Sequence, residues 1–99
     1  MSKKQNIKET VIKSDKVTYG AAVYSYSLIM RESRRVASYR IPLYSVRIEL
    51  ITEEGEHTSN EAKDVFADIG KALVFYDMLV DNLVTPLNLP YILEDEYMV

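Results

Sequence analysis

The spacing of the apolar residues changes once along this chain, near residue 67, and that change restricts the folds it can adopt. Between residues 38 and 52, Val46, Ile48 and Leu50 alternate with polar residues, which is the pattern of a strand with one buried face. After residue 67 the apolar residues recur at the spacing of one helix face: Ile69, Ala72, Leu73, Tyr76, Leu79, Val80 and Leu83. The sequence therefore predicts strands followed by helices, which is an α+β fold.

The strands are expected to form an antiparallel sheet with polar segments as its turns. Residues 17–30 are rich in Tyr and Val and predict one strand, with Gly20 as a bulge or a close backbone approach within it. The polar segments 31–35 and 53–56 predict turns, and residues 57–66 predict an exposed edge strand.

The start of the chain is open to two interpretations. Residues 1–16 form either a loosely ordered N-terminal segment or a first strand that turns back at Ser14–Lys16. In both cases residues 17–99 are predicted to form a single α+β domain.

Two helices are expected to close the chain. The first should end near Asn82–Thr85, because Pro86 lacks an amide donor and disfavours helical angles in the residue before it. A second, short helix is predicted from Leu89 to about Tyr97, with Asn88 as its N-cap. The predicted architecture is an antiparallel β-meander of three or four strands followed by two C-terminal helices packed on one face.

Composition excludes several classes of protein. The 99 residues contain no cysteine, which excludes a disulfide framework and thiolate zinc sites. No apolar run approaches the roughly 18 residues of a membrane span, and Met1 to Asn6 lead into no apolar signal core. We therefore expect a soluble cytoplasmic protein that holds no metal and no cofactor and does not bind membranes.

Residues suited to catalysis are scarce. The single histidine, His57, stands beside a predicted hairpin turn among glutamates, where a solvated side chain is expected rather than a general base or metal ligand. The three glycines, at positions 20, 55 and 70, form no phosphate-binding loop and no dinucleotide fingerprint. An active site could still be built from a tyrosine and a carboxylate in one pocket. The sequence favours a non-catalytic protein.

Charge is distributed unevenly along the chain. Residues 1–47 hold ten of the twelve Lys and Arg and three acids, a sum of +7, whereas residues 48–99 hold two bases and twelve acids, a sum of -10. A basic surface of this kind can bind nucleic acid, with five arginines as candidates: Arg31, Arg34, Arg35, Arg40 and Arg47. The sequence pI of about 5.1 is low for such a role. The competing explanation is pairing of basic with acidic segments, within one molecule or between copies.

The first predicted helix is apolar on more than one face. Val74, Phe75 and Met78 lie off its main apolar stripe, and a second apolar face is usually buried too. These three residues are therefore candidates for contact with another subunit, or else with the C-terminal helix. We predict a small module that acts by binding and self-associates as a homodimer through its helices or a sheet edge, with nucleic-acid binding as the alternative.

The C-terminal part of the chain resembles a known family. The resemblance rests on the strand Tyr44–Glu49, on the helix stop Asn82–Pro86 and on the closing segment Ile92–Asp95. Over roughly residues 38–96 the chain resembles a family of short, uncharacterised proteins of Gram-positive anaerobic bacteria, classed as a domain of unknown function. The resemblance implies a bacterial housekeeping or regulatory role, and it assigns no catalytic residue and no ligand.

Overall fold

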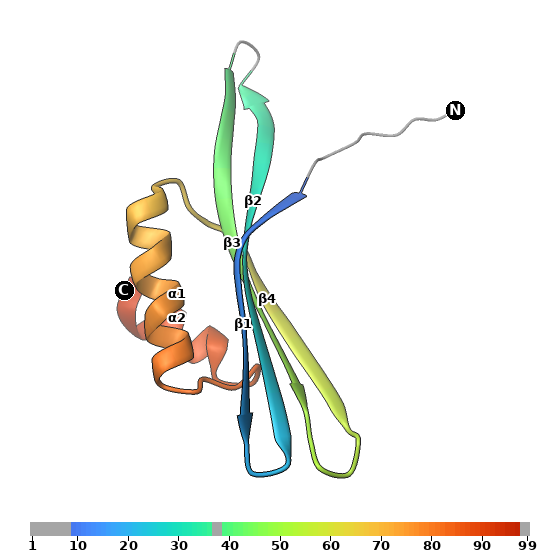
Figure 1. Ribbon diagram of the computed structural model, residues 1–99. Coiled ribbons are helices and arrows are strands. Elements are labelled where there is room, and N and C mark those ends of the chain that lie inside the picture. Colours follow the sequence, from blue (N-terminus) through green and yellow to red (C-terminus); the bar gives the residue numbers. More distant parts are fainter. Residues whose placement is uncertain (1–8, 37–38, 98–99) are drawn as a thin grey trace, which may run out of the picture.

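The chain forms a four-stranded antiparallel sheet with both helices on one of its faces (Figure 1). The computed structural model describes residues 9–36 and 39–97, with side chains described within 9–32 and 42–94. The sheet order is β1-β2-β3-β4, so each strand pairs with its neighbour in sequence. The elements are β1 (Glu9–Tyr19), β2 (Ala22–Val36), β3 (Tyr39–Ile51), β4 (His57–Phe66), α1 (Ile69–Asp81) and α2 (Leu89–Tyr97). The predicted α+β meander with two C-terminal helices is confirmed.

The first hairpin turn lies at Gly20 rather than at Ser14–Lys16. Tyr19 pairs with Ala22, and Gly20 between them adopts a φ of 63°, which glycine reaches without steric cost. The prediction of one strand across residues 17–30 was therefore wrong, because its first three residues close β1. Residues 9–16 are paired in β1, whereas residues 1–8 lie outside the described residues.

The second turn lies later than the sequence indicates. β2 continues through residues 31–35 to Val36, and β3 begins at Tyr39, so the turn predicted at 31–35 was wrong. Among the described residues, β1 and β4 pair with these strands no further than Arg31 and Tyr44. Beyond that level the two strands have no helix to pack against. Their sequences therefore do not need alternating apolar residues. We call residues 32–36 and 39–43 the β2–β3 arm.

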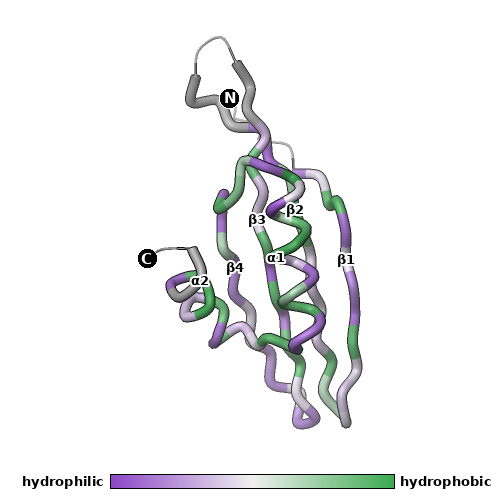
Figure 2. Tube along the Cα trace, turned by 90° about the vertical axis from the view of Figure 1, so that its left-hand side faces the viewer, coloured by the Kyte–Doolittle hydropathy of each residue, from purple (hydrophilic) through white to green (hydrophobic). Residues whose placement is uncertain are grey.

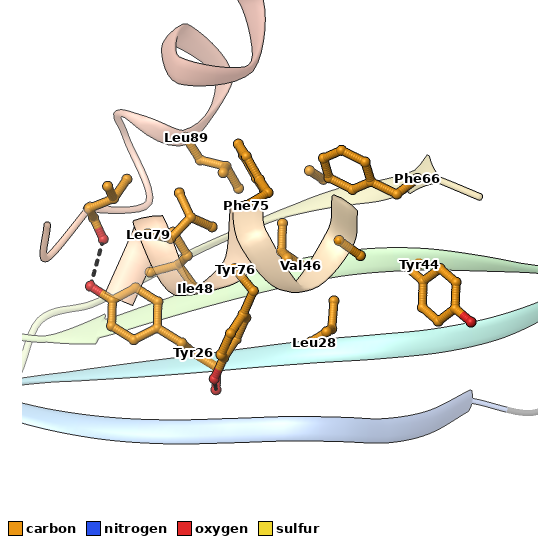
Figure 3. Close-up of a cluster of buried hydrophobic side chains, with 13 residues drawn as sticks. Tyr26, Leu28, Tyr44, Val46, Ile48, Phe66, Phe75, Tyr76, Leu79 and Leu89 are labelled. Carbon is orange, nitrogen blue, oxygen red and sulfur yellow. Dashed lines mark hydrogen bonds between the residues drawn. The ribbon is translucent and has the colours of Figure 1, made fainter. Parts of the chain in front are cut away.

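The core lies between the sheet and α1. Figure 2 shows α1 in front of the middle strands and α2 beside β4. Apolar side chains of β2 and β3 face those of α1 in one cluster, which Val84 and Leu89 extend toward α2 (Figure 3). Its fully buried members include Tyr26, Leu28, Val46, Ile48, Ala72, Phe75, Tyr76 and Leu79. The period-2 strands and the 3.6-residue helix thus meet along the faces that their patterns predict.

Both ends of α1 are fixed by local hydrogen bonds. Asp68 is its N-cap, and the Asp68 carboxylate accepts a hydrogen bond from the Lys71 amide at 2.9 Å. At the other end, Leu83 adopts a φ of 49°, while the Val84 amide donates to the Leu79 carbonyl at 3.0 Å. This is a Schellman motif, which ends the helix at Asp81, five residues before Pro86. The helix stops where the sequence predicts. The left-handed conformation of Leu83 is a second cause of this stop, besides Pro86, and the sequence did not indicate it.

Two tyrosine hydroxyls attach the helix layer to the sheet. The Tyr26 hydroxyl on β2 donates to the Val84 carbonyl at 3.0 Å. The Tyr76 hydroxyl on α1 lies 2.8 Å from the Asp15 carboxylate of β1 and 3.2 Å from the Tyr26 carbonyl. Because each bond joins segments at least 50 positions apart, they specify how α1 and the following loop sit on the sheet.

Candidate functional site

The sheet face opposite the helices carries a cluster of ion pairs with one residue from each strand. Arg31 of β2 lies between two glutamates: its Nη2 is 2.6 Å from Glu9 Oε2 on β1 and 3.2 Å from Glu61 Oε2 on β4. Arg47 of β3 reaches the same carboxylate, with Nη2 3.1 Å from Glu61 Oε1. We call Glu9, Arg31, Arg47 and Glu61 the four-strand charge cluster.

The cluster arises from the strand register. Glu9 pairs with Arg31 and Arg47 pairs with Glu61, so opposite charges stand directly across from each other. The hydrogen bond from Arg31 holds the pKa of Glu9 below its usual range, and that of Arg31 is raised chiefly by the same bond. The side chain of Arg31 is only 13% exposed, and its guanidinium is paired with carboxylates of the same molecule.

A serine lies beneath this cluster. Ser45 of β3 is fully buried, and its Oγ accepts a hydrogen bond from the Asp64 amide at 2.8 Å. Asp64 adopts a φ of 54° in β4, where the register against β3 shifts. Its carboxylate is 3.5 Å from Arg31 Nη1. Ser45 and Asp64 therefore fix the irregular end of β4, which is a structural role.

The structure separates the five arginines of the nucleic-acid hypothesis. Arg31 and Arg47 belong to the four-strand charge cluster. The β2–β3 arm contains Arg34, Arg35 and Arg40, and the structure describes their backbone but not their side chains. Another base of the N-terminal half, Lys13, forms an ion pair with Asp77 of α1, with 3.0 Å between Nζ and Oδ1. These six cations thus divide into a set paired on the body of the protein, Arg31, Arg47 and Lys13, and a set on the arm.

A shallow groove follows the outer side of the helix layer. Its largest hollow, about 570 Å³, lies between the β4–α1 connection and α2 and is lined by residues 64–68, Lys71 and Leu93. A second, of about 420 Å³, shares Asp68 and Lys71 with it and reaches Gly70 and Val74.

A third hollow, of about 400 Å³, shares Leu93 with the largest one and is lined also by Pro90, Tyr91 and Glu94. The largest hollow shares Asp68 and Lys71 with the second and Leu93 with the third, so the three adjoin one another from Val74 on α1 to Tyr91 on α2. We call this row of hollows the helix-side groove.

The three predicted interface residues have different environments. Val74 is 67% exposed and lines the helix-side groove, whereas Met78 is half-buried against the core. Phe75 is completely buried, with its ring 5.3 Å from that of Phe66. The assignment of Phe75 to an intersubunit contact is therefore corrected. Its position three residues after Ala72 and four before Leu79 places it within the core stripe, which is wider than the sequence indicated.

The groups considered for catalysis are one histidine and the tyrosines that lie near carboxylates. His57 is exposed at the first position of β4. Tyr76 stands beside a carboxylate, that of Asp15, but burial raises the pKa of Tyr76 and the hydrogen bond to Asp15 raises it further. Burial likewise raises the pKa of Tyr26 to about 12. Both phenols therefore stay protonated at neutral pH and serve as hydrogen-bond donors.

Several groove residues were missed by sequence reasoning. Gly70 contributes to the hollow by lacking a side chain, and Leu93 and Tyr91 enter it from the second helix. The only signal available was that Tyr91 lies off the apolar stripe that Leu89, Ile92 and Leu93 form on that helix. Within the described residues no group of three or more His, Cys, Asp or Glu is arranged to hold a metal ion, and no helix is long and apolar enough to cross a membrane.

A four-stranded antiparallel sheet with two C-terminal helices on one face defines the chain as a small α+β domain. Residues 4–98 match the model of the family of unknown function DUF6514, and the chain belongs to that family. The match covers nearly the whole chain, so it extends the resemblance seen in residues 38–96 to the N-terminal strands. No curated protein and no solved structure matches the chain.

Proposed function

We propose that this protein is a non-catalytic interaction module that forms a homodimer through the helix-side groove. The observation that carries the proposal is the row of adjoining hollows between the exposed side chains of Val74 and Tyr91, lined in part by apolar residues of the β4–α1 connection. An exposed apolar depression of this kind, rimmed by charges, is typical of a protein contact.

The occupant that fits best is a second copy of the chain. Among the described residues, the groove is lined by the cation Lys71 and by the carboxylates of Asp68 and Glu94. In a two-fold arrangement the same surface faces itself, so Lys71 of each copy can approach the carboxylates of the other. A chain of 99 residues also buries only about 65% of its unfolded surface, and it gains stability from any further apolar contact.

The sheet edges support this choice of surface. β1 carries Lys13, Asp15 and Lys16 and is interrupted by a register shift. β4 carries Lys63 and Asp64 beside a second shift. Charges and bulges on edge strands disfavour pairing with another sheet. Of the two routes to a dimer that the sequence leaves open, the helices are therefore the better supported. A cytoplasmic location, consistent with a chain that lacks cysteine, is part of the same proposal.

Light scattering coupled to size exclusion tests the proposal at about 100 μM protein. The wild type is expected at twice the 11.4 kDa of one chain. Val74→Glu should shift the measured mass to that of one chain. The new carboxylate would be buried in an apolar contact that already carries other carboxylates. The matched control is Tyr19→Glu, at a residue that is also 67% exposed but lies at the β1–β2 turn. A wild type of monomer mass would refute the dimer, and equal effects of both substitutions would refute the groove.

A further inference from the structure

β2 and β3 extend beyond the sheet as a two-stranded ribbon, the β2–β3 arm. Within the described residues, β1 pairs with β2 only as far as Glu9↔Arg31, and β4 pairs with β3 only as far as Phe66↔Tyr44. Past that level the two strands pair with each other through Glu32↔Pro42 and onward. Figure 1 shows the arm rising past the ends of β1 and β4.

The arm contains a register shift that brings three arginines to one level. Ser33 pairs with Ile41 and Val36 pairs with Tyr39, so two residues of β2 stand opposite one residue of β3. The two are Arg34 and Arg35, and the one is Arg40. All three positions in the bulge are therefore arginine, although the chain has seven lysines that it places elsewhere.

This placement has a cost for folding. Like charges opposite each other on paired strands destabilise the pair. The arm also lies beyond α1, so contacts with the core cannot offset this cost. Residues 32–43 contain a single acid, Glu32, against the three arginines. A ribbon of this charge is stabilised when an anion binds it.

Three exposed acids lie far from the arm, and three that lie nearer to its base, Glu9, Glu61 and Asp64, are paired with Arg31. Glu53, Glu54 and Glu56 are exposed in the β3–β4 turn, which Figure 1 places opposite the arm. β3 runs 11 positions from Arg40 to its end at Ile51, or about 36 Å at roughly 3.3 Å per residue, and Glu53 follows in the turn beyond it. That separation is several times the Debye length of about 10 Å in 0.1 M salt, so the low overall pI does not describe the field at the arm.

We propose that the β2–β3 arm binds duplex DNA, with the ribbon entering the major groove and Arg34, Arg35 and Arg40 contacting phosphates and base edges. The major groove of B-form DNA, about 12 Å wide, admits a two-stranded ribbon, whereas the groove of A-form RNA is too narrow for side chains to read. The planar guanidinium of arginine presents parallel N–H groups that match phosphate and guanine, whereas the ammonium of lysine acts as a point charge. The proposal goes beyond the dimer and uses a different surface.

Fluorescence anisotropy with a labelled mixed-sequence duplex of about 20 base pairs tests it on the full chain. Three phosphate contacts give a salt slope of about 2.7, so affinity should fall about 40-fold between 50 and 200 mM salt. The variant R34Q/R35Q/R40Q should bind at least about tenfold more weakly at 50 mM. The control K13Q/K16Q/K63Q, which changes the net charge equally from -3 to -6, should stay within about threefold of wild type.

A second readout separates lost binding from lost folding. Removing like charges from the arm should leave the melting temperature of the arginine variant unchanged or raised. No DNA binding by the wild type at 50 mM salt, or equal losses in both triple variants, would overturn the proposal. So would binding of the arm to vesicles containing phosphatidylserine in preference to duplex. If the arm joined the acidic turn of another copy, E53Q/E54Q/E56Q would abolish self-association, and the proposal would fail. The Val74→Glu variant should retain DNA binding, so failure of the dimer leaves this test intact.

Discussion

The face of the sheet under α1 buries Leu28, Val46 and Ile48, whereas the opposite face aligns Arg31, Arg47 and Glu61 in the four-strand charge cluster. Both faces belong to the same strands, since side chains alternate along each of them. The covered face is stabilised by removal of apolar surface from water, which is worth about 1.5–3 kcal/mol for each large side chain. The other face gains far less per contact, because exposed ion pairs typically contribute up to about 1 kcal/mol.

The difference indicates that the two faces have different tasks. Apolar contact is non-directional and tolerates small shifts of one strand along another. Ion pairs between all four strands favour one register, since a slip of one residue would place each charge on the opposite face. The open face therefore specifies alignment, while the covered face supplies most of the stability.

The largest expected effect is at the covered face. Phe75→Ala removes a fully buried ring that packs on Phe66, and it should lower the free energy of unfolding by about 3–5 kcal/mol. Leu87→Ala, at a side chain that is 72% exposed in the connection between α1 and α2, should change it by less than about 0.5 kcal/mol. Urea denaturation of both variants measures the difference, with Phe75→Leu as a milder substitution if the alanine variant does not fold. Equal costs at the two positions would contradict the assignment of Phe75 to the core.

A smaller effect is expected at the open face. A double-mutant cycle of Arg31→Met and Glu61→Gln should give a coupling energy of about 0.5–1.5 kcal/mol, because the pair is partly shielded from solvent. Urea is the required denaturant, since guanidinium would screen the pair. In 1 M salt the coupling should fall, as the Debye length shortens to about 3 Å. A coupling of zero at low salt would remove the role in alignment that distinguishes this face.

The sequence predicts the covered face better than the open one. The alternation from Tyr44 to Leu50 and the helical spacing from Ile69 onward identify most of the core, because each pattern depends on one element alone. The Asp68 cap and the short second helix follow from equally local rules. The class of fold could therefore be predicted, together with the order of its elements.

Features that depend on register could not be predicted. The polar segment 31–35 was assigned to a turn, because its lack of alternation hides a strand that extends past the core. The partners of Arg31 come from β1 and β4 and are known only once the strands are aligned. The helix-side groove depends on how α2 lies against the β4–α1 connection, and sequence spacing contains no information on that angle. The candidate site is thus largely a product of tertiary structure.

The smallest effect expected is the pH dependence that Glu9 gives to the open face. The hydrogen bond from Arg31 lowers the pKa of Glu9 in the folded state, so the folded protein holds this carboxylate charged more strongly than the unfolded chain does. Its stabilising contribution is therefore present above the unfolded pKa and is lost as the pH falls through the folded one. Because Glu9 is 43% exposed, solvent screening keeps the contribution well under about 1 kcal/mol.

Urea denaturation of wild type and Glu9→Gln at pH 7 and pH 3 measures this contribution. The wild type should be the more stable protein at pH 7, and the difference should shrink as the pH is lowered toward 3, because protonation of Glu9 in the folded state removes the favourable pairing. In an Arg31→Met background the same substitution should show little dependence on pH, because the hydrogen bond that lowers the pKa is gone. A pH dependence that survives in that background would mean that Glu9 responds to the general field of the sheet. The open face would then lack the specific pairing that sets it apart from the face under α1.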